Sequence, residues 1–331
     1  MKKAILILLL TAALLLSACT AEQPTTEYTA EAYPAITEVD HCVVEPDARA
    51  VMTDDDHEQY RALMEGMLAH RPAVETSAAG ERLDRLMDLM RRSPYYFFVR
   101  EAETTDGAVH FDYAYPAAEQ AKMLLQLDTA IMEIANANAD PDDNELDVIL
   151  KIYGAVTHRI EYDSKREDNK ELGSPLFEYP DREVYNALTE GEALCYGFAF
   201  VMRFALLQRG IDAFCVYGQC HAHNMGHEWV IFRYDGQYFH CDPAWDRASS
   251  GYAKLIHFGK TDDERVADTV IARPFIEYHE ESFGEITCTD ERFAIFRDMI
   301  RFTFLTGHRY YVENRKGEGA IFDSSTFTID G

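Results

Sequence analysis

The chain has 331 residues, 58 of them acidic and 31 basic, and its formal net charge at neutral pH is −27. This charge, without any lysine-rich or arginine-rich run, argues against a nucleic-acid partner and against electrostatic attraction to anionic lipid. The length is compatible with one large domain or with two.

The first 19 residues are organised like a bacterial lipoprotein signal peptide. Two lysines precede an apolar run over residues 4–16, which is too short and wrongly flanked for a spanning helix. The run Leu16-Ser17-Ala18-Cys19 resembles a lipobox, in which the cysteine becomes the acylated N-terminus. We therefore expect lipidation at Cys19 and a chain held on the cell membrane, outside the cytoplasm, at the cell surface or in the periplasm. The alternative is an ordinary signal peptide that happens to contain a cysteine.

A polar tether and an N-terminal α+β region are predicted next. Residues 20–35 are rich in threonine and glutamate and contain two prolines, which favours a flexible tether. Residues 36–139 form a region to which we assign no role. Its apolar periodicity predicts helices over 56–70, 81–92 and 117–135, and strands over 95–100 and 108–115.

A buried helix is predicted in the region 140–264, with Cys195 in or next to its first turn. Apolar residues recur at helical spacing from Leu194 to Leu206, the other faces are apolar too, and Gly210 is placed to end the helix. Unpaired backbone N–H groups and the positive end of the helix dipole favour a thiolate in the first turn. The alternative is that Cys195 packs in the core, as most free cysteines do.

A hairpin follows this helix. Residues 228–234 and 237–242 are rich in strand-forming residues and are separated by Asp235-Gly236, a strong signal for a two-residue turn. With that turn, Trp229 lies opposite Asp242, and His227 shares the same face, diagonal to Asp242. Local geometry alone therefore brings an imidazole and a carboxylate together. The alternatives are a strand-end histidine and an Asp-Pro turn former.

Four short motifs carry a family resemblance. The runs Cys-Tyr-Gly-Phe-Ala, Gly-Ile-Asp-Ala, His-Glu-Trp-Val and Asp-Pro-Ala-Trp resemble the core of the transglutaminase-like superfamily over about residues 145–264. The resemblance implies an α+β, papain-like fold in which the helix that carries the cysteine packs on an antiparallel sheet. It also implies a triad with Cys195 as nucleophile, His227 as base and Asp242 as the residue that orients the base.

The resulting hypothesis is an extracytoplasmic thiol enzyme that acts on carboxamide or peptide bonds of a protein or peptide substrate through a cysteine thioester. Cell-wall and surface proteins are candidate substrates. An amine acceptor would make the enzyme a transglutaminase-like acyltransferase, and water would make it a cysteine peptidase or amidase. A third possibility is a non-catalytic binding module on the same fold.

The remaining histidines and cysteines are residue types that can bind a metal. His221, His223 and Cys220 lie close in sequence to the hairpin, but their spacing matches no closed zinc motif. Strand alternation sends His240 and Cys241 to opposite faces, with His240 on the face of Asp242. We therefore expect no metal and no cofactor.

The other cysteines are expected to pack in the core, although a disulfide among Cys215, Cys220 and Cys241 is an open alternative. The last 67 residues, 265–331, are rich in Phe and Tyr, and short runs at 310–312 and 320–322 predict a β-rich appendage.

Overall fold

The structure is a computed structural model that describes residues 33–165, 183–220, 225–248, 252–267, 269–271 and 286–330. Cys19 and the signal peptide lie outside these residues, so the lipidation and anchoring predictions stay predictions. Among the described residues, no helix combines the length and apolar character that crossing a membrane requires.

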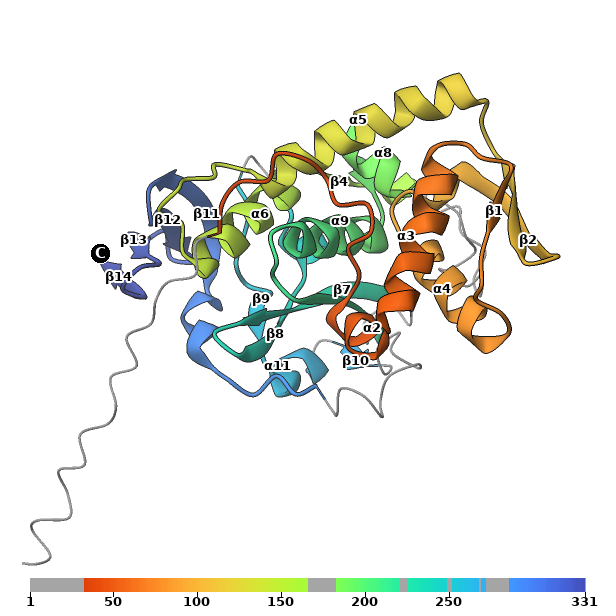
Figure 1. The fold of residues 1–331 in the computed structure, drawn as a ribbon. Helices are drawn as coiled ribbons and strands as arrows, with labels where there is room; N and C mark the ends of the chain where they lie inside the picture. Colours follow the sequence, from red (N-terminus) through yellow and green to blue (C-terminus); the bar gives the residue numbers. More distant parts are fainter. Residues whose placement is uncertain are drawn as a thin grey trace, which may run out of the picture. The chain divides into compact units, whose positions relative to one another are not determined.

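The N-terminal region contains helices and a small antiparallel sheet in the order β1-β3-β2 (Figure 1). Thr53 caps the second of its helices in a capping box with Asp56, and the β2–β3 turn places Asp106 and Gly107 at positive φ. The elements are α2 (Pro46–Val51), α3 (Asp54–Leu68), β1 (Ala73–Glu75), α4 (Glu81–Arg91), η1 (Tyr96–Phe98), β2 (Val99–Thr105), β3 (Ala108–Tyr113) and α5 (Ala117–Ala135).

The prediction of a strand over residues 95–100 is wrong for residues 95–98. The strand predicted over residues 95–100 begins only at Val99, because Tyr96–Phe98 form a 3-10 turn. All four aromatic side chains from Tyr95 to Phe98 are buried. A strand would have pointed alternate rings to opposite faces, whereas the tight turn lets four successive rings enter the core.

The central region contains the predicted Cys195 helix and a five-stranded antiparallel sheet. The sheet has the strand order β10-β6-β7-β8-β9. Its elements, with those that accompany it, are α6 (Glu145–Arg159), β4 (Glu161–Tyr162), α8 (Glu183–Thr189), β5 (Glu192–Ala193), α9 (Cys195–Gln208), β6 (Ala213–Cys220), β7 (Met225–Tyr234), β8 (Gln237–Cys241), α10 (Pro243–Asp246), β9 (Phe258–Lys260), α11 (Asp262–Val266) and β10 (Thr269–Ile271).

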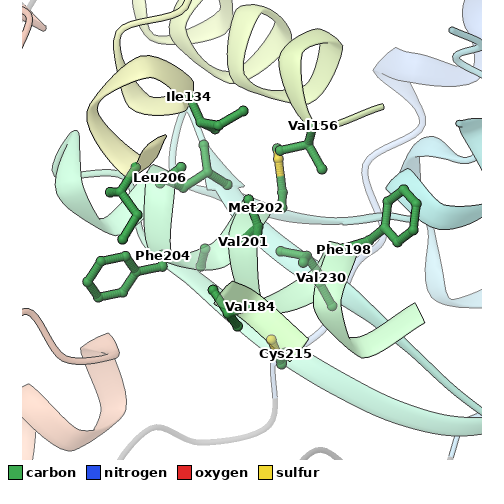
Figure 2. Packing of buried hydrophobic residues seen from close by; sticks show 14 of the residues in the cluster. Ile134, Val156, Val184, Phe198, Val201, Met202, Phe204, Leu206, Cys215 and Val230 are labelled. Carbon is green, nitrogen blue, oxygen red and sulfur yellow. The ribbon is translucent and has the colours of Figure 1, made fainter. Parts of the chain in front are cut away.

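Helix α9 forms the centre of the main core. It contacts β6 and β7 of the sheet and also α5, α6 and α8, so nearly all of its residues are buried, as its apolar faces predict (Figure 1). Figure 2 shows side chains of these elements meeting around it, among them Ile134 of α5, Val156 of α6 and Val230 of β7. This packing confirms the α+β fold in which the cysteine helix lies on an antiparallel sheet.

The C-terminal region is a four-stranded antiparallel sheet in the order β11-β12-β13-β14, preceded by a 3-10 turn. Its elements are η2 (Arg292–Phe296), β11 (Met299–Thr306), β12 (Arg309–Asn314), β13 (Gly319–Asp323) and β14 (Thr328–Asp330). The predicted end of the region 140–264 lies inside α11. Strand β10, beyond that residue, still pairs with β6 of the central sheet. The domain limits drawn from the sequence stay predictions.

Candidate active site

Cys195 is the first residue of α9. Leu194 before it has extended backbone angles, so the chain enters the helix at the cysteine, and the Leu194 N–H donates to the buried carboxylate of Glu183 over 2.5 Å. Gly197 lies one turn into the helix, where an added Cβ would come within 2.7 Å of the Ala193 Cβ and 2.9 Å of the Glu183 Cγ. The glycine of the Cys-Tyr-Gly motif is thus required by close packing at the start of the helix.

The hairpin has the register that the two-residue turn predicts. Asp235 and Gly236 both have positive φ, and the facing pairs run from Tyr234↔Gln237 to Val230↔Cys241. Asp242 directly follows β8 and lies within 2.6 Å of His227, measured from the carboxylate Oδ2 to the imidazole Nε2. The predicted imidazole–carboxylate pair is therefore present.

Cys195 completes the cluster, because its side chain interacts electrostatically with the His227 ring. Because Nε2 of His227 is bonded to Asp242, Nδ1 is the ring atom left for the cysteine. The structure thus brings together the three residues singled out in the sequence, Cys195, His227 and Asp242, and all three are at least 95% buried.

Two tryptophans surround the imidazole. The ring of Trp245 is stacked on His227 with centroids 4.6 Å apart and an interplanar angle of 14°, and Trp229 lies 6.0 Å away at 21°. Trp245 belongs to the short helix α10, and its backbone N–H donates to Oδ1 of Asp242 over 3.1 Å. The Asp242 carboxylate therefore caps α10 with one oxygen and binds His227 with the other.

The electrostatics of this group favour a charged pair. Burial lowers the pKa of His227, but the Asp242 charge and hydrogen bond outweigh burial and raise it to about 10. Burial raises the pKa of Asp242, but the charges of His227 and Arg265 outweigh this effect and hold that pKa well below its usual range. His227 is therefore an imidazolium and Asp242 a carboxylate at neutral pH.

Part of the chain matches a known protein family. Residues 133–243 match the family model described as the transglutaminase-like superfamily, a family of cysteine enzymes. The matched residues include Cys195, His227 and Asp242. No curated protein matches the chain.

Solved structures resemble parts of the chain at low identity. One, described as a TGase, is 16% identical with a TM-score of 0.32, and the match covers 48% of this chain and 47% of that one. A putative cysteine protease from Cytophaga hutchinsonii is 15% identical with a TM-score of 0.27, and 37% of each chain is covered. LapG from Legionella pneumophila is 12% identical with a TM-score of 0.25, covering 52% of this chain and 88% of that one. The chain spans less than half the length of the first two.

Among the residues that the structure describes, one cluster has atoms that could in principle hold a metal. Donor atoms of His240, Asp262 and Cys288 lie within 4.8 Å of one another. However, the Trp229 indole N–H donates to Nδ1 of His240 over 2.9 Å, so the neutral ring carries its proton on Nε2. That nitrogen lies 2.9 Å from Asp262 Oδ1 and has no lone pair for a cation, which makes this cluster a hydrogen-bond network.

His240 does share the face of Trp229, as strand alternation predicts, but its ring nitrogens bind Trp229 and Asp262 and not the triad. The thiols of Cys42, Cys215, Cys241 and Cys288 are free, whereas the side chain of Cys220 lies outside the described residues, as do His221 and His223.

Sequence reasoning missed two residues of this transglutaminase-like site. Arg265 donates to Oδ2 of Asp242 over 2.7 Å, and Glu183 holds the backbone at the start of α9. Neither is signalled by a motif, because each reaches the site from another element. The hydrophobic periodicity of a segment does not show where a single charged side chain within it points.

Proposed function

We propose that this protein is a thiol enzyme that acts on carboxamide or peptide bonds by transglutaminase-like acyl transfer through a thioester on Cys195. The observation that carries the proposal is the contact chain from the Cys195 thiol to the His227 imidazole and on to Asp242, at the start of a buried helix. A nucleophile, a base and a group that orients the base are the parts that this chemistry requires.

The proposed reaction has two steps. The Cys195 thiolate forms a C–S bond with the carboxamide carbonyl, and the C–N bond breaks as the His227 imidazolium gives its proton to the leaving amine. An acceptor amine or water then loses a proton to His227, forms a bond to the carbonyl carbon and releases the thiolate. Asp242 keeps the ring oriented and stabilises its positive charge throughout, while backbone N–H groups at the start of α9 are suited to stabilising the oxyanion.

The proposal also includes where in the cell this enzyme is anchored. The lipobox-like run ending at Cys19 supports a lipid-anchored enzyme outside the cytoplasm, acting on proteins or peptides of the cell envelope. Metabolic labelling with a fatty acid, lost in the variant Cys19→Ala, is the expected result. Unlabelled wild-type chain would contradict the anchor without touching the chemistry.

The first test measures how the alkylation rate of each cysteine depends on pH. In the purified full chain, iodoacetamide should label Cys195 with a midpoint well below the free-thiol pKa of about 8.5. The variant His227→Ala should lose this reactivity, whereas His110→Ala, which removes an exposed histidine of β3, should keep it. Labelling of wild-type Cys195 no faster than that of Cys42 would refute the enzyme and favour a binding module.

The acceptor is tested separately. Incorporation of a labelled primary amine into a glutamine-containing protein, lost in Cys195→Ala, is expected for the transferase. Release of ammonia or peptide without incorporation would reassign the same triad to a hydrolase. Because both reactions pass through the same thioester, this result changes only the second step.

A further inference from the structure

We infer that Arg265 is a positioning residue of this active site, which fixes the Asp242 carboxylate and supplies a positive charge beside the triad. This inference rests on the proposed function. It adds to the triad a residue from α11, which lies beyond the residues that match the family model.

The first observation is that Arg265 and the base share one oxygen atom. Asp242 Oδ2 accepts from a terminal guanidinium nitrogen of Arg265 at 2.7 Å and lies 2.6 Å from Nε2 of His227. Its other oxygen accepts from the backbone N–H of Trp245. With both oxygens engaged, the carboxylate cannot rotate away from the imidazole without losing a charge-assisted hydrogen bond.

The second observation is the position of the guanidinium between the indole rings. Its central carbon lies 4.2 Å from the ring centroid of Trp229 and 4.5 Å from that of Trp245, the two rings that also stack near His227. Arg265 is 1% exposed. Stacking and the hydrogen bond together leave the planar group little freedom, which a flexible lysine would not reproduce.

The third observation is the anchoring of α11. Thr261 and Glu264 form a capping box at its start, and Asp262 binds His240 of β8. Arg297 holds Glu264 through two ion contacts and also donates to the carbonyls of Phe258 and Gly259. The helix is therefore held on both sides, and its position sets the position of Arg265.

Burial of a guanidinium is costly, and replacing a buried ion pair with apolar groups often leaves stability unchanged or improved. A contribution to the stability of the fold is therefore a weak explanation for a buried arginine at position 265. Its electrostatic effect on Asp242 is direct, because the guanidinium charge lowers the pKa of that carboxyl and so keeps a carboxylate beside the His227 imidazolium.

Other ionisable groups face the same site from neighbouring elements. Cys195 comes from α9, Glu228 from β7, and Asp246 and His257 flank Asp242. Glu228 interacts electrostatically with His227, and burial raises the pKa of its carboxyl to about 8, so it is mostly neutral at pH 7. Among the described residues, Arg265 is the cation that forms a hydrogen bond with Asp242 beside His227.

The test compares the alkylation midpoint of Cys195 in the purified full chain and in three variants. Arg265→Gln should move the midpoint up by about half a pH unit or more, because an Asp242 carboxylate that can turn away from His227 stabilises the imidazolium less, and the imidazolium is the cation that favours the thiolate. Arg265→Lys retains the charge and should bring the midpoint back toward the wild-type value. Asp147→Ala, which breaks buried hydrogen bonds between α6 and Tyr310 and Ser324 without touching α11 or Asp242, should lower the melting temperature and leave the midpoint unchanged.

The outcomes separate the hypotheses. A midpoint in Arg265→Gln equal to that of the wild type, or an equal shift in Asp147→Ala, would overturn the role of Arg265 and leave the proposed function standing. A wild-type Cys195 without enhanced reactivity would overturn both. If Arg265→Gln does not fold, Arg265→Met, whose thioether can fill the space between the indoles, is expected to show the same shift.

Discussion

At the scale of single residues, the site depends on the carboxylate of Asp242, both oxygens of which are hydrogen-bonded. Asp242 binds His227 and Arg265 with one oxygen and caps α10 with the other. The pairing of His227 with Asp242 could be predicted because both residues lie on one hairpin with a recognisable turn. The Arg265 contact could not, because α11 reaches Asp242 through tertiary packing across 23 residues of chain.

The first prediction concerns the charge of Asp242. In Asp242→Asn the imidazolium loses its carboxylate, so the pKa of His227 should fall and the alkylation midpoint of Cys195 should rise toward the free-thiol value of about 8.5. Asp262→Asn is the matched control, because that carboxylate binds His240 and not His227. Equal midpoints in the wild type and Asp242→Asn would contradict the electrostatic account.

The second prediction concerns the pH dependence of stability. The pKa of His227 is raised by the Asp242 pair from its ordinary value near 6.5 to about 10, so the folded state binds more protons than the unfolded state between these values. The stabilisation is complete below about pH 6.5 and should be lost as the pH rises through about 10. Urea unfolding across this range should show a smaller loss of stability in His227→Gln than in the wild type.

The raised pKa of Glu228 makes the comparison between the wild type and His227→Gln necessary. Burial raises its pKa from the ordinary 4.5 to about 8, so it also causes a loss of stability with rising pH, between about 4.5 and 8. Only the difference between the wild type and His227→Gln isolates the histidine. Parallel stability curves from pH 6.5 to 10 would show that the pKa of His227 is not raised in the folded state.

At the scale of elements, the start of α9 is formed by packing as much as by helix propensity. The sequence places Cys195 in or next to the first turn of this helix, and it predicts the helices at 81–92 and 117–135 within one residue at each end. Apolar periodicity was sufficient for these helices. It failed at Tyr95–Phe98, where burial of consecutive aromatic rings requires a 3-10 turn and not a strand.

The third prediction concerns Gly197. In Gly197→Ala the new methyl group would lie 2.7 Å from the Ala193 Cβ and 2.9 Å from the Glu183 Cγ, so the first turn of α9 must shift. We expect a loss of stability of about 1–3 kcal/mol and slower alkylation of Cys195.

Gly154→Ala, in α6, serves as the control for this change. Its new methyl group would meet only the edge of the Phe302 ring at 3.2 Å, and alanine favours the helix. We expect a loss of stability smaller than in Gly197→Ala and an unchanged alkylation rate. If Gly197→Ala has wild-type reactivity, the close packing at the start of α9 is not needed for the thiol.

At the scale of the molecule, the C-terminal sheet is attached to the central core by a buried polar cluster. Asp147 of α6 is fully buried and accepts hydrogen bonds from Tyr310 at 2.8 Å and from Ser324, and it pairs with His308. The sequence predicted the strands but not this attachment, because the partners are more than 160 residues apart and no local pattern links them.

The fourth prediction concerns this attachment. Asp147→Ala removes three partners from the C-terminal region and a helix cap from α6, so the free energy of unfolding should fall by about 3 kcal/mol or more. Glu133→Gln removes an exposed ion pair with Arg159 and should cost less than about 1 kcal/mol. Equal unfolding midpoints for the two variants in urea would mean that the Asp147 cluster does not hold the sheet.

The stacking of Trp245 on His227 has an optical consequence. The chain contains two tryptophans, Trp229 and Trp245, and both flank the guanidinium of Arg265 and lie beside the imidazole of His227. All the indole fluorescence of the protein therefore originates within a few ångströms of the reacting groups. Because a protonated imidazole quenches a stacked indole, the native emission intensity reports directly on the protonation of His227, without an introduced label.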